Sequence, residues 1–371
     1  MKNSPDRAAA DAAALARFSR AVLRAAGADS ATAAAATRAM MHASSLGIDS
    51  HGIRLLGHYV RAIDGGRVKG RPRLRFARNK GAVAMLDAGH AHGALAAYRA
   101  MARATAMAAR QGIGAVGIAN SSHFGAAGAY ALAAAEEGFI GVAVCNSDAF
   151  VRLHGGAARF HGTNPIAAAC PVAGARPWLL DMATSAIPYN RVQLYRSLGR
   201  ALPAGTASDA RGADTRAPEE AAMLAPLGAA FGFKGAGLAG LVEILSAVLT
   251  GMRLSYEILP MGGPDMRTPR RMGAFVLAID PRAFLPGEAF AKRMAVYLRT
   301  LRRSPAGSGD AAMAPGDREW RQAALRAAAG IPIDPETRKE FARLSETYDV
   351  PAPSLRESPK TGNIRKERNG R

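Results

Sequence analysis

The sequence predicts an α/β fold in which helical segments flank a strand-rich middle. Three observations predict it: helical periodicity alone up to residue 63, apolar runs alternating with alanine-rich helical runs between residues 82 and 182, and renewed helical periodicity after residue 288. Strand and helix units of this length are typical of α/β proteins.

The first part of the chain is expected to form a small helical bundle. Ser30 is the expected N-cap of the second helix, because its hydroxyl can accept a hydrogen bond from the first free N–H groups. The predicted helices span Asp6–Ala26, Ser30–Leu46 and Ser50–Ile63.

The middle of the chain is expected to supply a sheet. Apolar runs predict strands at Ala82–Leu86, Gly114–Ala119, Ile140–Cys145, Ile166–Cys170, Trp178–Asp181 and Ala274–Ile279. Helices are predicted at Gly93–Arg110 and after Gly125. The segment Leu198–Glu219 is rich in Gly, Pro, Ala and Asp without periodicity, which predicts a loop.

One glycine motif in this region is misleading. Residues 112–117 match GxGxxG, yet they end a predicted helix and open a strand. A dinucleotide fingerprint has the opposite order, because its glycines bring a pyrophosphate to the N-terminus of a helix. These glycines are therefore expected to end a helix in a tight turn.

Helices are predicted again at Gly235–Leu249, Glu288–Leu301, Asp317–Ala328 and Pro335–Glu346. The last of these would close back on the first part. We therefore expect a helical part, residues 1–80 packed with 285–350, and an α/β part, residues 81–284, that binds cofactor and substrate. The basic tail, residues 351–371, is expected to be disordered.

Composition bounds the class of protein. A chain of 371 residues, 49% of them hydrophobic, can bury a sizeable core. Cys145 and Cys170 lie in apolar runs without CxxC spacing, which favours free thiols in a reducing cytoplasm. The start has no apolar signal region, and the longest apolar helix, residues 237–252, is short of the ~20 residues that cross a bilayer and carries Glu243. We expect a cytoplasmic protein with no membrane partner.

The net charge of +20 does not by itself indicate a nucleic-acid partner. The arginines are scattered among alanines, only 6% of residues are aromatic, and no zinc-finger or RNP-like pattern occurs. No nucleic-acid partner is expected. His154 and His161 lack metal-ligand spacing and no HExxH run exists, so no catalytic metal is expected either.

A histidine stands at the most informative point of the chain. Residues 120–125 (NSSHFG) follow an apolar strand and precede a helical run. Polar clusters at such a junction are where α/β enzymes usually place their chemistry. His123 is therefore the first candidate for an acid or base.

Motifs in a fixed order resemble one family. They are residues 49–54 (DSHGIR), 120–125 (NSSHFG), 162–165 (GTNP) and 180–185 (LDMATS). Together they are similar to the malate/L-lactate dehydrogenase family, which lacks a Rossmann fold and also contains ureidoglycolate dehydrogenase, sulfolactate dehydrogenase, diketogulonate reductase and piperideine-2-carboxylate reductase. The resemblance spans roughly residues 10–350. It implies a mixed-sheet cofactor domain, a helical bundle domain, and a homodimer with the site near their junction.

The resemblance also implies NAD or NADP as cofactor. Residues 232–237 (GFKGAG) are similar to the family's Lys-Gly-x-Gly, and glycines, helix N–H groups and a lysine suit a phosphate. Pro315–Arg318 matches the family's adenosine side, although the same residues are ordinary capping chemistry. The cofactor positions carried over are Ser147, Asp181, Met182, Ala183, Lys234, Gly316, Asp317 and Arg318.

The family uses both histidine positions, and its members differ over which one handles the proton. We assign His123 as the base that takes the hydroxyl proton during oxidation, with His51 polarising the same oxygen or replacing it. Ser50 is expected to cap a helix and to touch substrate. Tyr59 is expected to line the same wall, or to be a buried structural residue.

Arg54 is the expected carboxylate clamp, because a guanidinium binds a carboxylate through two parallel hydrogen bonds. In the family the arginine stands four residues after the histidine. Here it stands three after His51, and Leu55 holds the usual place. On a helix both offsets lie on nearly the same face, so we expect the clamp to persist with a changed angle. The identity of the substrate stays open.

The sequence thus predicts an NAD(P)-dependent oxidoreductase acting on a small 2-hydroxy or 2-oxo carboxylate of the lactate, malate or ureidoglycolate type. One alternative is a cyclic imino-acid reductase, which would use the same clamp but protonate nitrogen. A second is a basic binding protein without catalysis, favoured only by the shifted position of Arg54.

Overall fold

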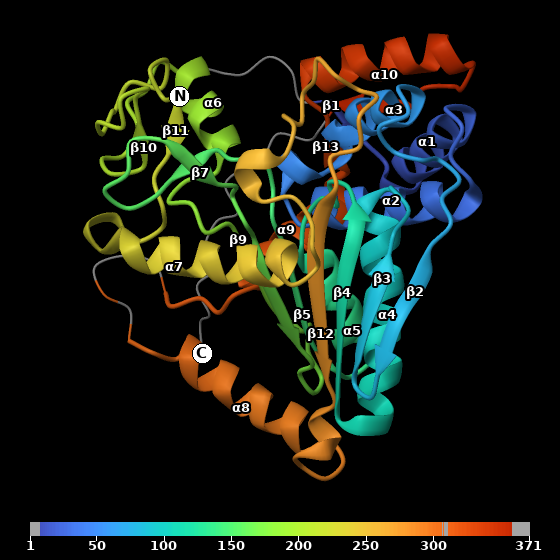
Figure 1. Cartoon of the computed structure of the whole chain (residues 1–371), viewed down its shortest axis with the longest axis vertical. Helices are drawn as coiled ribbons and strands as arrows, with labels where there is room; N and C mark the ends of the chain where they lie inside the picture. The colour runs from blue at the N-terminus through green and yellow to red at the C-terminus, as the bar shows by residue number, and fades with distance from the viewer. Residues whose placement is uncertain (1–7, 306, 308–310, 358–371) are drawn as a thin grey trace, which may run out of the picture.

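Seven strands form one mixed sheet through the middle of the chain, as Figure 1 shows. The computed structural model describes residues 8–305, 307 and 311–357. In spatial order the strands are β2 (Arg75–Lys80), β3 (Val83–Asp87), β4 (Ile113–Ser121), β12 (Met272–Ile279), β5 (Ile140–Cys145), β8 (Ile166–Cys170) and β9 (Trp178–Met182). Only β3 and β4 pair in parallel in this sheet; all other neighbours are antiparallel. The predicted α/β fold with a mixed sheet is confirmed.

Two alanine-rich helices pack on one face of this sheet. They are α4 (Gly93–Gln111) and α5 (Gly128–Glu136). Close approach explains the small residues on the strands: a Cβ at Gly114 would lie 2.1 Å from the carbonyl oxygen of Ala104, and one at Gly141 would lie 2.4 Å from that of Ala131. The main hydrophobic core therefore lies between these helices and the sheet.

The other face of the sheet is covered by α7 (Gly232–Glu243) and the π-helical turn Ile244–Val248 that continues it. A Cβ at Gly273 of β12 would lie 1.7 Å from the Ser246 carbonyl oxygen, so only glycine fits there. By length and composition, Ala229–Val248 is the one helical stretch among the described residues that could cross a membrane. Its Glu243, however, is buried inside the protein.

A helical part joins the two ends of the described chain. It contains α1 (Ala12–Ala25), α2 (Ser30–Ser45), α3 (Leu56–Asp64), α9 (Asp317–Ala329) and α10 (Pro335–Tyr348), with a three-stranded sheet of β13 (Ile331–Pro332), β1 (Ala8–Ala10) and β14 (Leu355–Glu357). Residues of the first and last segments, such as Phe18 and Phe341, share one core.

Three local expectations for this part were wrong. The helix expected from Asp6 begins at Ala12, because the Asp11 carboxylate accepts a hydrogen bond from the Ala14 N–H and residues 8–10 pair as a strand. Asp29, not Ser30, caps α2. In the tail expected to be disordered, residues 355–357 form β14; residues 358–371, like 1–7, lie outside the described residues.

The helix α8 (Ala289–Arg302) does not pack with the N-terminal helices. Its buried Leu298 contacts Val172 and Ala314 instead. The strand β2 likewise lies before the boundary expected at residue 80 and is nevertheless part of the large sheet. The two parts of the molecule therefore interleave along the sequence more than the expected boundaries suggest.

A small third unit lies beside the large sheet. Its strands are β10 (Ala207–Ser208), β11 (Met223–Leu224), β6 (Val151–Arg152) and β7 (Arg159–His161), next to α6 (Tyr189–Ser197). The expected loop Leu198–Glu219 has no helix and contributes only β10. The rejected GxGxxG motif also folds as predicted, because Gly112 ends α4 with φ of 81° just before β4.

Candidate active site

Two histidines from distant motifs meet beside a tyrosine. The rings of His51 and His123 are stacked with their centroids 5.8 Å apart. Tyr59 Oη lies 3.0 Å from His123 Nδ1, and Ser50 Oγ lies 2.8 Å from His51 Nδ1. Four of the residues singled out in the sequence are therefore brought together at the junction of the helical part and the sheet.

The turn after β4 fixes the position of His123. Ser122 Oγ donates to the carbonyl oxygen of Ala91 and accepts a hydrogen bond from the Gly93 N–H. A Cβ at Gly93 would lie 2.2 Å from the Ser122 carbonyl oxygen, so glycine is required where α4 begins. Gly125, with φ of 80°, then turns the chain beneath Tyr59.

His92 also belongs to this cluster. Its ring packs edge-on against Tyr59 with a centroid distance of 4.2 Å, and its Nδ1 caps α4 by accepting from the Ala94 N–H. Burial lowers the pKa of His92 to about 3. A histidine directly before the start of a helix was the available signal, because Nδ1 can serve as an N-cap acceptor.

Burial keeps the central imidazoles neutral. It lowers the pKa of His123 well below the usual 6.5, with smaller effects from His51, His58 and Arg270, and it lowers the pKa of His51 in the same direction. Burial also raises the pKa of Tyr59, so its phenol stays protonated. The tautomer in which His123 Nδ1 donates to the tyrosine oxygen leaves the Nε2 lone pair free to accept a proton.

The motif around His51 is not the helix that was expected. Two 3-10 turns, Asp49–His51 and Ile53–Leu55, meet at Gly52 before α3 begins. A Cβ at Gly52 would lie 2.3 Å from Ser44 Oγ, which accepts a hydrogen bond from the Ile53 N–H. Ser50 therefore caps no helix, and its hydroxyl is directed to His51 instead.

The shifted arginine points elsewhere. Arg54 Nε lies 3.3 Å from Asp334 Oδ2, and both side chains are partly exposed. The argument that offsets of three and four share a helix face does not apply, because this segment is 3-10 and interrupted at Gly52. Within the described residues, Arg54 has no ion pair or hydrogen bond with the histidine cluster.

A line of cofactor candidates follows the open edge of β9. Asp181 near its end accepts a hydrogen bond from the Gly128 N–H at the start of α5, 2.9 Å away, and burial raises its pKa to about 6. Met182 ends the strand and Ala183 follows it. Near the other end of β9, the backbone at Gly316 lies close to that of Leu179. A Cβ at Gly316 would lie 3.1 Å from the Leu179 nitrogen, so glycine allows the two segments to come this close.

The remaining candidates lie at neighbouring loop and helix ends. Ser147 follows β5, and its Oγ accepts a hydrogen bond from the Thr163 N–H at 3.2 Å. Lys234 lies inside the first turn of α7, because the helix begins at Gly232 rather than at Gly235. Asp317 and Arg318 open α9, where the Asp317 carboxylate pairs with Arg302 at 2.6 Å.

These residues fit an extended dinucleotide. Lys234 is exposed and, within the described residues, its ammonium contacts only the Phe231 ring, 5.3 Å from the centroid. The backbone of residues 184–186 pairs with residues 225–227 just before α7, which ties this lysine to the end of β9. Gly235 allows α7 to pack closely on this segment, since a Cβ there would lie 2.2 Å from the Leu227 carbonyl oxygen. The ammonium is therefore available to a phosphate beside β9.

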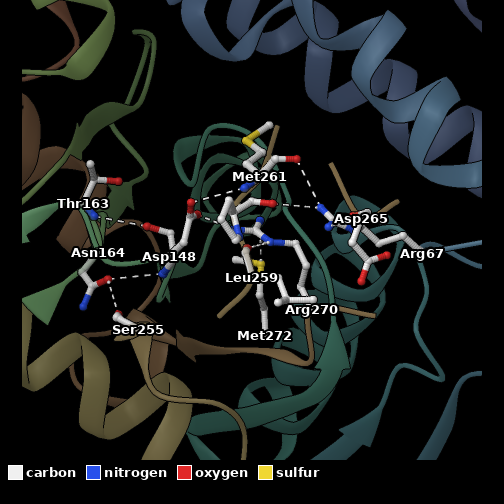
Figure 2. A network of polar contacts seen from close by, with 12 residues as sticks. Arg67, Asp148, Thr163, Asn164, Ser255, Leu259, Met261, Asp265, Arg270 and Met272 are labelled. Atoms are coloured by element: carbon white, nitrogen blue, oxygen red, sulfur yellow. Dashed lines mark hydrogen bonds and ion pairs between the residues drawn. The ribbon is translucent and has the colours of Figure 1, made fainter. Parts of the chain in front are cut away.

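Glu243, at the end of α7, is hydrogen-bonded to several loops around these residues. Its buried carboxylate accepts hydrogen bonds from the side-chain amides of Asn146 and Asn164 and from both the N–H and the Oγ of Ser255. Asn164 Oδ1 in turn accepts from the Ser147 N–H. One carboxylate on α7 thus fixes three loops; Figure 2 labels two of the residues bonded to it, Asn164 and Ser255.

A second polar network, also drawn in Figure 2, lies on the other side of Asp148. Arg270 donates to the carboxylate of Asp148 and to the carbonyl oxygen of Leu259, while Arg67 donates to the carbonyl oxygens of Pro260 and Met261. Sequence reasoning missed these arginines, because no motif marks them. No group of three or more His, Cys, Asp or Glu residues in the described part of the chain is arranged to hold a metal ion.

Comparison with known proteins places the chain in a family. Residues 10–342 match the family described as malate/L-lactate dehydrogenase. The chain belongs to the malate/L-lactate dehydrogenase family. Its resemblance, recognised from the motifs, is confirmed.

Relatives within this family carry several names. A malate dehydrogenase of Pyrococcus abyssi is 39% identical over 70% of this chain and 72% of its own length. A ureidoglycolate dehydrogenase (NAD(+)) of Escherichia coli O157:H7 is 33% identical over 79% and 84%. A pyrroline-2-carboxylate/piperideine-2-carboxylate reductase of Pseudomonas putida is 35% identical over 81% and 85%.

The fold of the family is also shared. The crystal structure of malate dehydrogenase from Entamoeba histolytica superposes with a TM-score of 0.87 at 28% identity, covering 92% of this chain and 98% of that one. The non-Rossmann fold expected from the motifs is thereby confirmed.

Proposed function

We propose that this protein is an NAD(P)-dependent dehydrogenase that interconverts a small 2-hydroxy carboxylate and its 2-oxo acid. The single observation that carries the proposal is the stacked pair of neutral histidines, His51 and His123, in a chain that matches the family over residues 10–342. Relatives named for malate and ureidoglycolate support the substrate class.

The chain's own groups account for the proton. When bound, the nicotinamide accepts or supplies the hydride. His123 Nε2 takes the hydroxyl proton during oxidation and returns it during reduction, while Tyr59 holds the ring through Nδ1. His51, oriented by Ser50, stands next to it and polarises the same oxygen.

The cofactor-binding roles are proposed on the same basis. Lys234 and the α7 start are suited to the phosphates, Ser147 and Asp181–Ala183 to the nicotinamide side, and Gly316–Arg318 to the adenosine side. Either NAD or NADP fits these contacts.

A test uses the purified protein with NADH or NADPH and a panel of 2-oxo acids, following loss of absorbance at the nicotinamide band. We expect turnover by the wild type, and a loss of about 10²- to 10⁴-fold for His123→Ala, the usual contribution of a general acid or base. Circular dichroism and NADH fluorescence check that fold and cofactor binding persist. Full turnover by that variant would remove His123 from the mechanism.

The imino-acid reductase is the second candidate, favoured by the reductase among the relatives. The same pocket would then protonate nitrogen instead of oxygen. Comparing pyruvate with piperideine-2-carboxylate under identical conditions separates the two, since each activity predicts a higher kcat/KM for its own substrate.

We further propose a cytoplasmic homodimer that binds neither nucleic acid nor membranes. The outer face of α7 and of the π-helical turn that continues it exposes a row of apolar side chains, among them Leu241 at 50%, Ile244 at 55% and Val248 at 61%. Such a row next to Lys234 is suited to a second copy of the chain. Both cysteines are free, as expected of a reducing compartment.

Light scattering tests the dimer. We expect twice the chain mass of 38.6 kDa for the wild type and the single mass for Leu241→Glu combined with Ile244→Glu. Leu198→Glu, which changes an exposed leucine directly after α6, is the matched control. A wild type with the single mass at all concentrations, or retention on anionic vesicles or RNA at physiological salt, would contradict the proposal.

A further inference from the structure

Two arginines are buried beside the histidine cluster. Arg67 and Arg270 are each 2% exposed. Arg270 lies two residues before β12, whose first residue, Met272, pairs with Ser121, two residues before His123. The charge of Arg270 also lowers the pKa of His123 and of His58. The Arg270 guanidinium is therefore close enough to His123 to act on it electrostatically, whereas Arg54 is directed to Asp334.

One of these two guanidinium groups has no carboxylate bonded to it among the described residues. The Asp148 carboxylate accepts a hydrogen bond from Arg270 Nη2. Arg67 donates only to backbone carbonyl oxygens, and its buried Nε has no partner among the described residues. The nearby Asp265 carboxylate accepts from backbone N–H groups of Arg267 and Thr268. Of the two guanidinium groups, only that of Arg270 has a carboxylate hydrogen-bonded to it in the described part of the chain; because buried charges are normally paired, this favours a further anion.

Of the two residues in the Arg270–Asp148 ion pair, Asp148 is the one whose side chain has room to move. Its side chain is 31% exposed, while that of Arg270 beneath it is 2% exposed, so the aspartate covers the guanidinium from the open side. It directly follows Ser147, on the loop after β5. Figure 2 shows Asp148 between Arg270 and Met261, whose N–H also donates to it.

We propose that Arg270 binds the carboxylate of the substrate, and that Asp148 occupies this guanidinium until the substrate replaces it. Arg67 adds positive charge behind the pair. This inference rests on the proposed function for the ligand class, a 2-hydroxy or 2-oxo carboxylate. A substrate carboxylate held there is next to His123, and the charge-assisted contact takes the place of the clamp expected from Arg54.

The experiment compares three variants of the full-length protein loaded with NADH. Arg270→Lys keeps the charge but loses the planar fork, and we expect it to raise KM for the 2-oxo acid about ten- to hundredfold. Asp148→Asn removes the competing carboxylate and should leave KM equal or lower. Arg282→Lys is the matched control, because Arg282 is also paired with an aspartate, Asp280, but beyond the other end of β12; its KM should stay at the wild-type value.

Calorimetric titration with oxamate, an unreactive analogue of a 2-oxo acid, gives a readout that needs no turnover. Loss of oxamate binding in Arg270→Lys, with NADH affinity unchanged, is expected. If the wild type reduced no 2-oxo acid but bound oxamate through Arg270, the proposed function would fail while this subsite remained. A rise in KM for Asp148→Asn equal to that for Arg270→Lys would indicate a purely structural pair and overturn the proposal. So would a rise for Arg54→Met with none for Arg270→Lys.

Discussion

At the scale of single residues, the candidate site is built from buried imidazoles that are uncharged. Burial lowers the pKa of His51, His92 and His123, so all three rings are neutral. One nitrogen of each ring has a hydrogen-bond partner: the Ser50 hydroxyl for His51, the Ala94 N–H for His92 and the Tyr59 hydroxyl for His123. Neutral rings can share a small volume that imidazolium ions could not. The cluster therefore favours a base over an acid in the free protein.

This predicts opposite pH profiles for the two directions. Because burial holds the pKa of His123 well below 6.5, the neutral base predominates above that pH, and kcat/KM for oxidation should stay flat between pH 8 and pH 6.5. Reduction needs the protonated ring, so its kcat/KM should rise about tenfold per unit as pH falls over the same range. Steady-state rates in both directions check this, and an oxidation rate that falls below pH 7.5 would contradict it.

At the scale of elements, α7 carries the exposed Lys234 at one end and the buried Glu243 at the other. Its start presents Lys234, and its buried Glu243 fixes Asn146, Asn164 and Ser255, each on a different loop. The π-helical turn that follows at once allows the helix to continue across β12. A π turn is a common sign of a functional position within a helix.

Glu243→Gln should therefore destabilise the protein by about 2–3 kcal/mol, because all four groups around the carboxylate are donors and an amide nitrogen would face one of them. Urea unfolding followed by circular dichroism measures the change. Glu257→Gln is the control: that exposed carboxylate accepts from a single backbone N–H, of Leu254, and its loss should cost at most about 1 kcal/mol. Equal effects of the two changes would disprove the central role of Glu243.

Elements with strong apolar runs could be predicted from the sequence, and others could not. The strands β4, β5, β8, β9 and β12 lie where the apolar runs placed them. The strand β2 reads RFARNK and lies exposed at the sheet edge, so it carries no apolar signal. The strands of the third unit have only two or three residues each, too few for any periodicity.

The candidate site divides in the same way. His51, Ser50 and Tyr59 could be linked to His123 through recognisable motifs. Arg270 could not, because its position depends on the register between β12 and β4, which no local pattern determines. The direction of Arg54 depended on a break at Gly52 that a helical periodicity does not reveal.

At the scale of the whole molecule, buried histidines also set the response to acid. The pKa of His42 and of His58 is lowered to about 4, and that of His92 to about 3, in each case mainly by burial. In the unfolded chain these imidazoles bind protons near pH 6.5, whereas in the folded protein they stay neutral down to a lower pH. Acidification through this range therefore stabilises the unfolded state relative to the folded state. Asp181 opposes this, since its raised pKa of about 6 favours the folded state on acidification, but it is one group against several.

We therefore expect the urea midpoint to fall steadily from pH 6.5 to pH 4.5. His58→Gln should flatten that decline by removing one of the contributing groups, whereas His154→Gln, at a histidine whose side chain lies outside the buried cluster, should leave the slope unchanged. Unfolding curves at half-unit intervals measure both. A midpoint that is constant, or that rises on acidification, would be inconsistent with neutral buried rings.

The three-stranded sheet of the helical part has a consequence for synthesis of the protein. Ala8–Ala10 is among the first described segments to leave the ribosome, yet the strands beside it, residues 331–332 and 355–357, are among the last. Arg326, which binds Asp49 next to the reactive turn, is also made late. The turn that carries His51 thus cannot take up its final form on a nascent chain that lacks residues 326–357, and we expect activity only after these residues have been made.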